Sequence, residues 1–335
     1  MGLISILKKK NNKTLFTTPS HSGKFCIFHK FYQWYKADIS EIDALNPEKA
    51  LQEAETKAAK IYGTKYTKFL TNGSTSGIIS AILASQPKKI LIWDNAHPCH
   101  KNGAKLSGAE IIEYSSPFDT ELGIFKAITL TTIKKLLSKH TPDTLVITSP
   151  TYEGFVADVK EISKFCNENN VTLIVDEAHG ALYPFSDELP ESAVKFADFT
   201  VQSLHKTAGG INPTALLHSN KIDPTEALSM INTTSPSYPM LATIEANINY
   251  LNSTKGRKHI KSLINNIKAL KLPQLNDDVT KILLKGGEEL SDLLFNKHNI
   301  EDERTNSKTT MLLCGIGTGL KKLERLKKAL NNLCL

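Results

Sequence analysis

The sequence of 335 residues predicts an α/β protein: a mostly parallel sheet with helices on both faces, followed by a small C-terminal α+β domain. Up to about residue 250, short apolar runs alternate with helical patterns, the order that produces parallel strands joined by crossover helices. Beyond that point the chain changes to lysine-rich helical segments with one short apolar run. We therefore expect an N-terminal segment (1–45), a large domain (46–250) and a small C-terminal domain (251–335).

Each element follows from local patterns along the chain. Helices are expected where apolar residues recur at helical spacing between capping residues, and strands where short apolar runs are bounded by turn residues. The expected helices are 46–63, which ends at Gly63, then 74–85, a segment ending near Leu106, 159–170 and 320–333. The expected strands are 66–73, 89–93, 110–116, 144–150, 172–178, 199–204, 214–220 and 309–317. In parallel sheets of this kind, ligands bind at the carboxyl ends of the strands.

Composition narrows the class of protein. The hydrophobic content of 40% is ordinary for a globular protein, and no run of about 18 apolar residues is present that could span a membrane. The start, MGLISILKKKNN, lacks the long apolar stretch of a secretory signal, so we expect a cytoplasmic protein. The five cysteines are odd in number and contain no CxxC pair, which favours reduced thiols over a disulfide framework.

The net charge of +7 does not by itself indicate a nucleic-acid surface. Only three of the 41 basic residues are arginines, the side chain that most often reads phosphates and bases. The lysines are spread along the whole chain. We therefore expect a solvated lysine-rich surface and no nucleic-acid partner.

The string VDEAHG (175–180) contains the tetrapeptide typical of nucleic-acid helicases. Such a motor also needs the phosphate loop GxxxxGK[ST]. The Gly23-Lys24 pair is followed by Phe25, and Thr18 stands where the leading glycine should be. Without that loop there is no cradle for nucleotide phosphates, so the helicase interpretation is rejected.

The strand ends favour a different chemistry. Asp176 ends one apolar run, Lys206 in SLHK follows another, and TNGSTSGI (71–78) places small hydroxyl residues where a strand gives way to a helix. A carboxylate, an amine and a hydroxyl-rich helix N-terminus are what pyridoxal phosphate requires for its ring nitrogen, its aldehyde and its phosphate. The sequence therefore predicts a pyridoxal 5'-phosphate site at one edge of the sheet.

Five longer motifs make the pattern specific: LTNGSTSG, DNAHPCHKNGAKLSGAE, TSPTYEG, the segment from VDEAHG to QSLHK, and INTTSPSYP. In order and spacing they resemble the short bacterial members of the Orn/Lys/Arg decarboxylase family, pyridoxal-phosphate enzymes with the aspartate-aminotransferase fold (fold type I). FTTPSHSGK and ADISEIDALN near the start resemble the family's N-terminal segment. The resemblance is good from about residue 16 to 250 and weak beyond.

The resemblance implies a role for each matched residue. Lys206 matches the Schiff-base lysine, Asp176 the partner of the ring nitrogen, His100 the histidine that stacks on the ring, and His179 a residue lining the cofactor or substrate side. Phosphate contacts are matched by Ser74, Thr75, Ser76, Ser203 and His205. Thr234 and Ser235 resemble a segment that reaches the phosphate of the neighbouring subunit, which implies a homodimer with its active site at the subunit interface.

Several of these residues also have plainer interpretations. Asp176 could cap a helix, Ser74 to Ser76 could form only an N-cap, and Thr234 and Ser235 could be ordinary turn residues. His97, Cys99 and His100 could be metal ligands, but no fourth ligand stands at a recognisable spacing, so no metal is expected.

The family resemblance implies decarboxylation of lysine, ornithine or arginine to the corresponding amine, a reaction of polyamine biosynthesis. Two alternatives stay open. One is another pyridoxal-phosphate reaction, such as an aminotransferase or lyase, in which Arg304 would clamp the substrate α-carboxylate. The other is a non-catalytic protein of the same fold. Two departures from the family motivate it: the glycine-rich PGHKGG appears here as PSHSGK, and the further C-terminal domain that many members carry is not found in this sequence.

Overall fold

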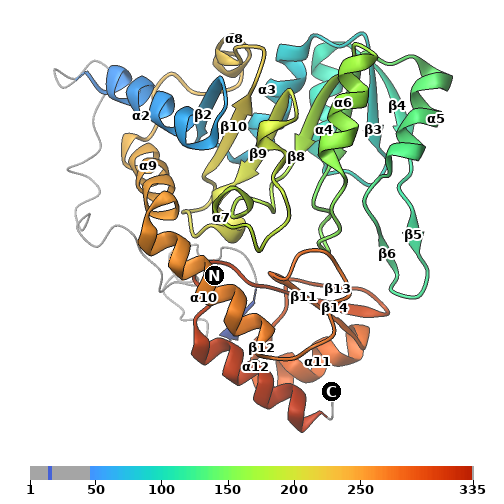
Figure 1. Ribbon diagram of the computed structural model, residues 1–335, viewed down its shortest axis with the longest axis vertical. Helices are drawn as coiled ribbons and strands as arrows, with labels where there is room; N and C mark the ends of the chain where they lie inside the picture. Colours follow the sequence, from blue (N-terminus) through green and yellow to red (C-terminus); the bar gives the residue numbers. More distant parts are fainter. Residues whose placement is uncertain (1–13, 17–45, 334–335) are drawn as a thin grey trace, which may run out of the picture.

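The computed structural model describes residues 14–16 and 46–333 (Figure 1). The expected N-terminal segment, with the motifs FTTPSHSGK and ADISEIDALN, lies almost wholly outside the described residues. Within the described part, no helix has both the length and the apolar character needed to cross a membrane. Cys99, Cys166 and Cys314 are buried and unpaired.

A seven-stranded sheet forms the centre of the larger part of the chain, in the order β2-β10-β9-β8-β7-β3-β4 (Figure 1). Its strands are β2 (Tyr66–Leu70), β3 (Lys89–Trp93), β4 (Glu110–Tyr114), β7 (Thr144–Thr148), β8 (Thr172–Asp176), β9 (Phe199–Ser203) and β10 (Ala215–Ser219). Only β10 runs against its two neighbours. The expectation of a mostly parallel sheet is therefore confirmed, and the other six strands end at the same edge.

Successive residues of the central strands enter different cores, because side chains alternate across a sheet. On β3, Leu91 packs with α5 (Leu130–His140) and α6 (Val159–Glu168), while Ile90 packs with α3 (Gly73–Ser85) and α4 (Pro98–Ser107). Both residues are fully buried. Helices therefore cover both faces of the sheet, as expected for strands that are apolar throughout.

Helix boundaries follow their capping residues. α2 (Pro47–Tyr62) begins after Asn46, whose side chain accepts from the Lys49 amide, and ends at Gly63 in the left-handed conformation. α3 lies so close to the sheet that a Cβ on Gly77 would come within 2.7 Å of Leu70 Cδ1. The glycine allows the helix to pack directly on the strands.

The C-terminal part contains a three-stranded antiparallel sheet, β11 (Lys281–Lys285), β14 (Thr309–Leu313) and β13 (Arg304–Thr305), in that order. It packs with α10 (Thr254–Lys268), α11 (Gly287–His298) and α12 (Leu320–Asn332), which lie below the large sheet in Figure 1. α9 (Tyr238–Asn252) leads from the large sheet to α10. The short β1 (Thr14–Leu15) pairs with β12 (Ile300–Glu301).

Several details differ from the sequence expectation, among them a missed strand and the position of Lys206. β11 was missed, because five residues with a lysine at each end give only a weak strand signal, and the strand depends on pairing with β14. Lys206 does not directly end a strand: it lies in α7 (Leu204–Thr207), a single helical turn after β9. The domain boundaries at residues 45 and 250 stay a prediction.

Candidate active site

A cavity of about 570 Å³ opens at the edge where the parallel strands end. Its walls include six of the residues that the sequence predicted for the site: Ser74, Thr75, Asp176, His179, His205 and Lys206. They come from the turn into α3, the end of β8 and the turn after β9, which are far apart in the chain. The parallel order of the strands brings these three segments to one place.

Asp176 is the last residue of β8 and is only 6% exposed. Its Oδ2 accepts a hydrogen bond from Nε2 of the buried His100 at 2.9 Å, and its Oδ1 accepts one from the Ala178 amide at 3.1 Å. Burial alone would raise the pKa of this carboxyl, but the His100 hydrogen bond and the nearby positive groups lower it below the usual value. Asp176 is therefore a stable carboxylate anion at the base of the cavity.

Lys206 and His179 lie next to each other on the cavity wall. The Lys206 Nζ lies 3.2 Å from His179 Nε2. Burial lowers the pKa of the Lys206 ammonium, although the Asp176 carboxylate opposes this shift. Burial and the charge of Lys206 lower the pKa of His179 well below its usual value, so its imidazole is neutral. The neutral His179 Nε2 is therefore placed to accept a hydrogen bond from the Lys206 ammonium.

The N-terminus of α3 forms another wall. The side chain of Asn72, at the N-cap, makes no capping hydrogen bond, so it does not occupy the amides of the first turn. Ser74 and Thr75 line the cavity there, whereas Ser76 is buried and its hydroxyl donates to the Gly73 carbonyl. A helix start of this kind, with adjacent hydroxyls, is suited to binding an anion.

Other residues that line the cavity were not predicted for the cofactor site from the sequence, or were given another role there. The cavity is also lined by Trp93, His97, Thr148, Tyr152, Glu153 and Arg304. Arg304 comes from β13 of the small sheet, and its guanidinium lies 4.8 Å from the centre of the Tyr152 ring. Tyr152 and Glu153 belong to the motif TSPTYEG, so the motif itself was the available signal for them.

Three predicted residues lie behind the cavity wall. Ser76, His100 and Ser203 are buried, and none of them lines the cavity. His100 contacts Asp176 instead, while His97, one turn earlier, is exposed on the wall. The ring-stacking role of His100 therefore stays a prediction, with His97 as a second candidate.

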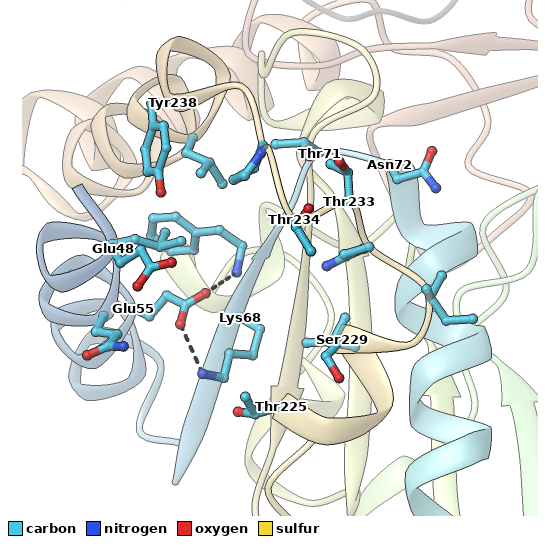
Figure 2. A pocket seen from close by; sticks show the side chains of 18 residues that line it. Glu48, Glu55, Lys68, Thr71, Asn72, Thr225, Ser229, Thr233, Thr234 and Tyr238 are labelled. Carbon is cyan, nitrogen blue, oxygen red and sulfur yellow. Dashed lines mark hydrogen bonds and ion pairs between the residues drawn. The ribbon is translucent and has the colours of Figure 1, made fainter. Parts of the chain in front are cut away.

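Thr234 and Ser235 are exposed and do not line the cavity of Lys206. Thr234 instead lines a second cavity of about 750 Å³, between α2, β2 and the segment before α9, where Glu55 forms an ion pair with Lys68 (Figure 2). Asn72 lines both cavities. The expected role of Thr234 and Ser235 toward a neighbouring subunit also stays a prediction.

The residues present fit pyridoxal phosphate. Three polar atoms on the cavity wall, Trp93 Nε1, Thr148 Oγ1 and His179 Nδ1, are buried without a hydrogen-bond partner among the described residues. Such atoms are costly unless a polar ligand satisfies them. The cavity volume is in the range of small-molecule sites. It provides an amine at Lys206, an anion at Asp176 and a helix N-terminus at α3, one for each reactive part of the cofactor.

Residues 4–318 match the family model described as "Orn/Lys/Arg decarboxylase, major domain". An arginine decarboxylase of Bacillus cereus is 28% identical over 367 residues, which covers 97% of this chain and 80% of that protein. These matches extend across both the large sheet and the small sheet.

Solved structures agree on the fold. The constitutive lysine decarboxylase of Escherichia coli superposes with a TM-score of 0.75 at 21% identity, covering 98% of this chain but only 59% of the other. An alanine–glyoxylate aminotransferase from Nostoc superposes with a TM-score of 0.65 at 15% identity, covering 90% of this chain and 92% of the other. The fold is therefore that of the fold type I pyridoxal-phosphate enzymes.

Family match, fold and cavity agree, and together they establish that this chain belongs to the pyridoxal-phosphate-dependent Orn/Lys/Arg decarboxylase family.

Proposed function

We propose that the protein decarboxylates a basic amino acid, lysine, ornithine or arginine, to the corresponding amine and carbon dioxide. The observation that carries the proposal is the cavity in which Lys206, hydrogen-bonded to His179, shares a wall with the buried Asp176 carboxylate. The names of the relatives support the reaction and leave the choice among the three substrates open.

Bound pyridoxal phosphate would supply an aldehyde that reacts with amines and a ring that accepts the electron pair left when carbon dioxide departs. Asp176 is the residue that would keep the ring nitrogen protonated, because its pKa is held low by His100 and it stays an anion. A carboxylate about 4 Å from a cation gains roughly 4 kcal/mol at an effective dielectric of about 20. Ser74, Thr75 and the amides at the start of α3 would hold the phosphate.

Lys206 has two tasks in this proposal. Its lowered pKa increases the fraction of neutral amine, which is the form that attacks an aldehyde. When the bond between the α-carbon and the carboxylate breaks, a proton must reach the α-carbon. The Lys206 ammonium lies on the cavity wall and can deliver that proton, and the neutral His179 imidazole, which accepts a hydrogen bond from it at 3.2 Å, would orient it.

One observation favours a second candidate function. Arg304 reaches the cavity from the small sheet, the place from which an aminotransferase would clamp an α-carboxylate, and the fold is shared with an aminotransferase. An aminotransferase would convert bound pyridoxal phosphate to pyridoxamine phosphate on addition of an amino acid. A decarboxylase would release carbon dioxide and retain the pyridoxal form.

The test uses purified protein loaded with pyridoxal phosphate, alongside Lys206→Ala. We expect a visible absorption band in the wild type that is absent from the variant, and carbon dioxide release from at least one of L-lysine, L-ornithine and L-arginine by the wild type only. A wild-type band without release from any of the three would contradict the decarboxylase proposal. Absence of the band from both proteins would favour a non-catalytic member of the fold.

We infer a cytoplasmic homodimer in which Thr234 and Ser235 approach the phosphate of the partner. Sedimentation of the loaded protein at micromolar concentration, with the mass compared to 37.0 kDa for one chain, tests the dimer.

A further inference from the structure

We propose that Glu153 binds the distal cation of the substrate, the ammonium or guanidinium at the far end of its side chain, and so selects basic amino acids. This deepens the function proposed above and rests on it. In the absence of substrate, Glu153 is paired with Arg304, and the substrate cation takes the place of that arginine.

The cavity offers few anions for such a cation. Among the described residues that line it, only Asp176 and Glu153 are carboxylates. Asp176 is already held by His100 and by the Ala178 amide, and it faces the cofactor in the proposed function. Glu153 is therefore the carboxylate that remains for a ligand.

Glu153 is buried but incompletely paired. Its side chain is only 9% exposed, and its closest cation is Arg304, with 3.6 Å between Oε1 and Nε. That distance is too long for a hydrogen bond, and the Arg304 side chain is itself 47% exposed. Burial raises the pKa of Glu153, and the charge of Arg304, a hydrogen bond from the backbone amide of Glu153 itself and the charge of Lys281 oppose the shift. A buried carboxylate with a weak partner gains strongly from a cation that can donate hydrogen bonds directly.

The backbone fixes the position of Glu153. The Asn276 side chain donates to the Glu153 carbonyl at 2.6 Å, and the Asp277 and Asp278 amides donate to the Gly154 carbonyl at 3.0 and 3.1 Å. Gly154 has a φ of +96°, which L side chains rarely adopt, and a Cβ there would come within 3.0 Å of the Lys281 and Asn276 side chains. The carboxylate is therefore held at the junction of the two sheets before any ligand binds.

Tyr152 connects this carboxylate to the reacting end of the cavity. Its ring centre lies 4.8 Å from that of His179, the partner of Lys206, and the Arg304 guanidinium lies 4.8 Å from the same ring. Lys206 and Glu153 are thus linked by a chain of contacts through His179, Tyr152 and Arg304. A substrate held near Lys206 by its α-amino group would extend along Tyr152 toward Glu153.

The experiment measures binding, not turnover. Protein loaded with pyridoxal phosphate is titrated with 1,5-diaminopentane and with pentan-1-amine, and the visible absorption of the bound cofactor is followed. The two probes differ only in the distal amine. In wild type we expect the diamine to bind more tightly. In Glu153→Gln we expect the Kd of the diamine to rise about 10- to 100-fold, the range for losing a hydrogen bond between charged groups, and the Kd of the monoamine to change by less than about 3-fold.

Two further variants make the result specific. Glu303→Gln is the matched control, because Glu303 is the neighbouring carboxylate that accepts from the Tyr152 hydroxyl and does not line the cavity. It should leave the preference for the diamine unchanged. Glu153→Asp keeps the charge and should give an intermediate preference, which also provides a test if Glu153→Gln does not fold.

Equal weakening of both amines in Glu153→Gln, or no preference for the diamine in wild type, would overturn the proposal. The results also distinguish failure of this proposal from failure of the proposed decarboxylase function. Wild type that prefers the diamine but releases no carbon dioxide contradicts decarboxylation and leaves the role of Glu153 intact. A decarboxylase whose preference survives Glu153→Gln contradicts only the role of Glu153.

Discussion

Lys281 and Asp278 form an ion pair in which neither side chain is exposed, with 2.6 Å between Nζ and Oδ2. The same carboxylate accepts from the Tyr183 hydroxyl at 2.7 Å, and its other oxygen accepts from Thr280. Lys281 and Asp278 belong to the small sheet and the loop before it, whereas Tyr183 follows β8 in the large part of the chain. This buried cluster therefore fastens the two parts together.

Removing one partner of that pair should be costly. Lys281→Met leaves Asp278 buried without its cation, and we expect a loss of about 3–5 kcal/mol of unfolding free energy. Lys281→Met with Asp278→Asn should lose less than the sum of the two single variants. Denaturant unfolding measures both, with Lys101→Gln in the exposed pair with Glu113 as the control, at about 0–1 kcal/mol. Additive single losses would show that the pair is not coupled.

The stability that the ionised Asp176 contributes to the folded protein should depend on pH. The folded pKa of Asp176 is lowered, so its contribution to stability is present above the ordinary pKa of 3.8 and is lost as pH falls through the folded value. His100→Phe should therefore destabilise by about 1.5–3 kcal/mol at pH 7. Unfolding of His100→Phe and of the double variant with Asp176→Asn measures the coupling. If His100→Phe costs the same with Asn at position 176, the hydrogen bond does not hold the carboxylate.

The contribution of Glu177 to stability should depend on pH in the opposite direction to that of Asp176. It accepts hydrogen bonds from Ser192, the Ala193 amide and Gln202, but burial outweighs them and raises its pKa from 4.5 to about 7. The folded protein thus binds an extra proton between those values, so this contribution to stability is complete below about pH 4.5 and is lost as pH rises through about 7.

The size of that effect follows from the shift. At 1.36 kcal/mol per unit, up to about 3 kcal/mol of stability should disappear with rising pH. Thermal unfolding of wild type and Glu177→Gln between pH 5 and 8 measures it. We expect the slope to be smaller in the variant, and equal slopes would mean that Glu177 does not titrate in this range.

Gly77 should not tolerate a methyl group. Its Cβ would lie 2.7 Å from Leu70 Cδ1 and 2.9 Å from Val201 Cγ1, both fully buried in the core under α3. Gly77→Ala should therefore destabilise by about 1–3 kcal/mol through overpacking. Gly319→Ala, where no atom lies within 4 Å of the added carbon, is the matched control in chemical denaturation. Similar losses in both variants would exclude close packing as the cause.

The sequence by itself determined the α/β class, all seven strands of the large sheet, and the residues Asp176, His179 and Lys206 near strand ends. It could do so because strand periodicity, caps and the motif order are local, and parallel strands must end at one edge. The sequence also contained Tyr152 and Glu153 within the motif TSPTYEG, but nothing local distinguished them from other loop residues.

Only the tertiary structure decided how the small sheet completes the cavity. Glu153 and Arg304 are 151 positions apart and meet because the small sheet docks through Asn276 and the buried cluster at Asp278. Packing within the larger part of the chain put His100 behind Asp176 and placed Thr234 at the second cavity. Contacts of this kind depend on how large elements pack against each other, and packing between distant segments leaves no periodic signal in the sequence.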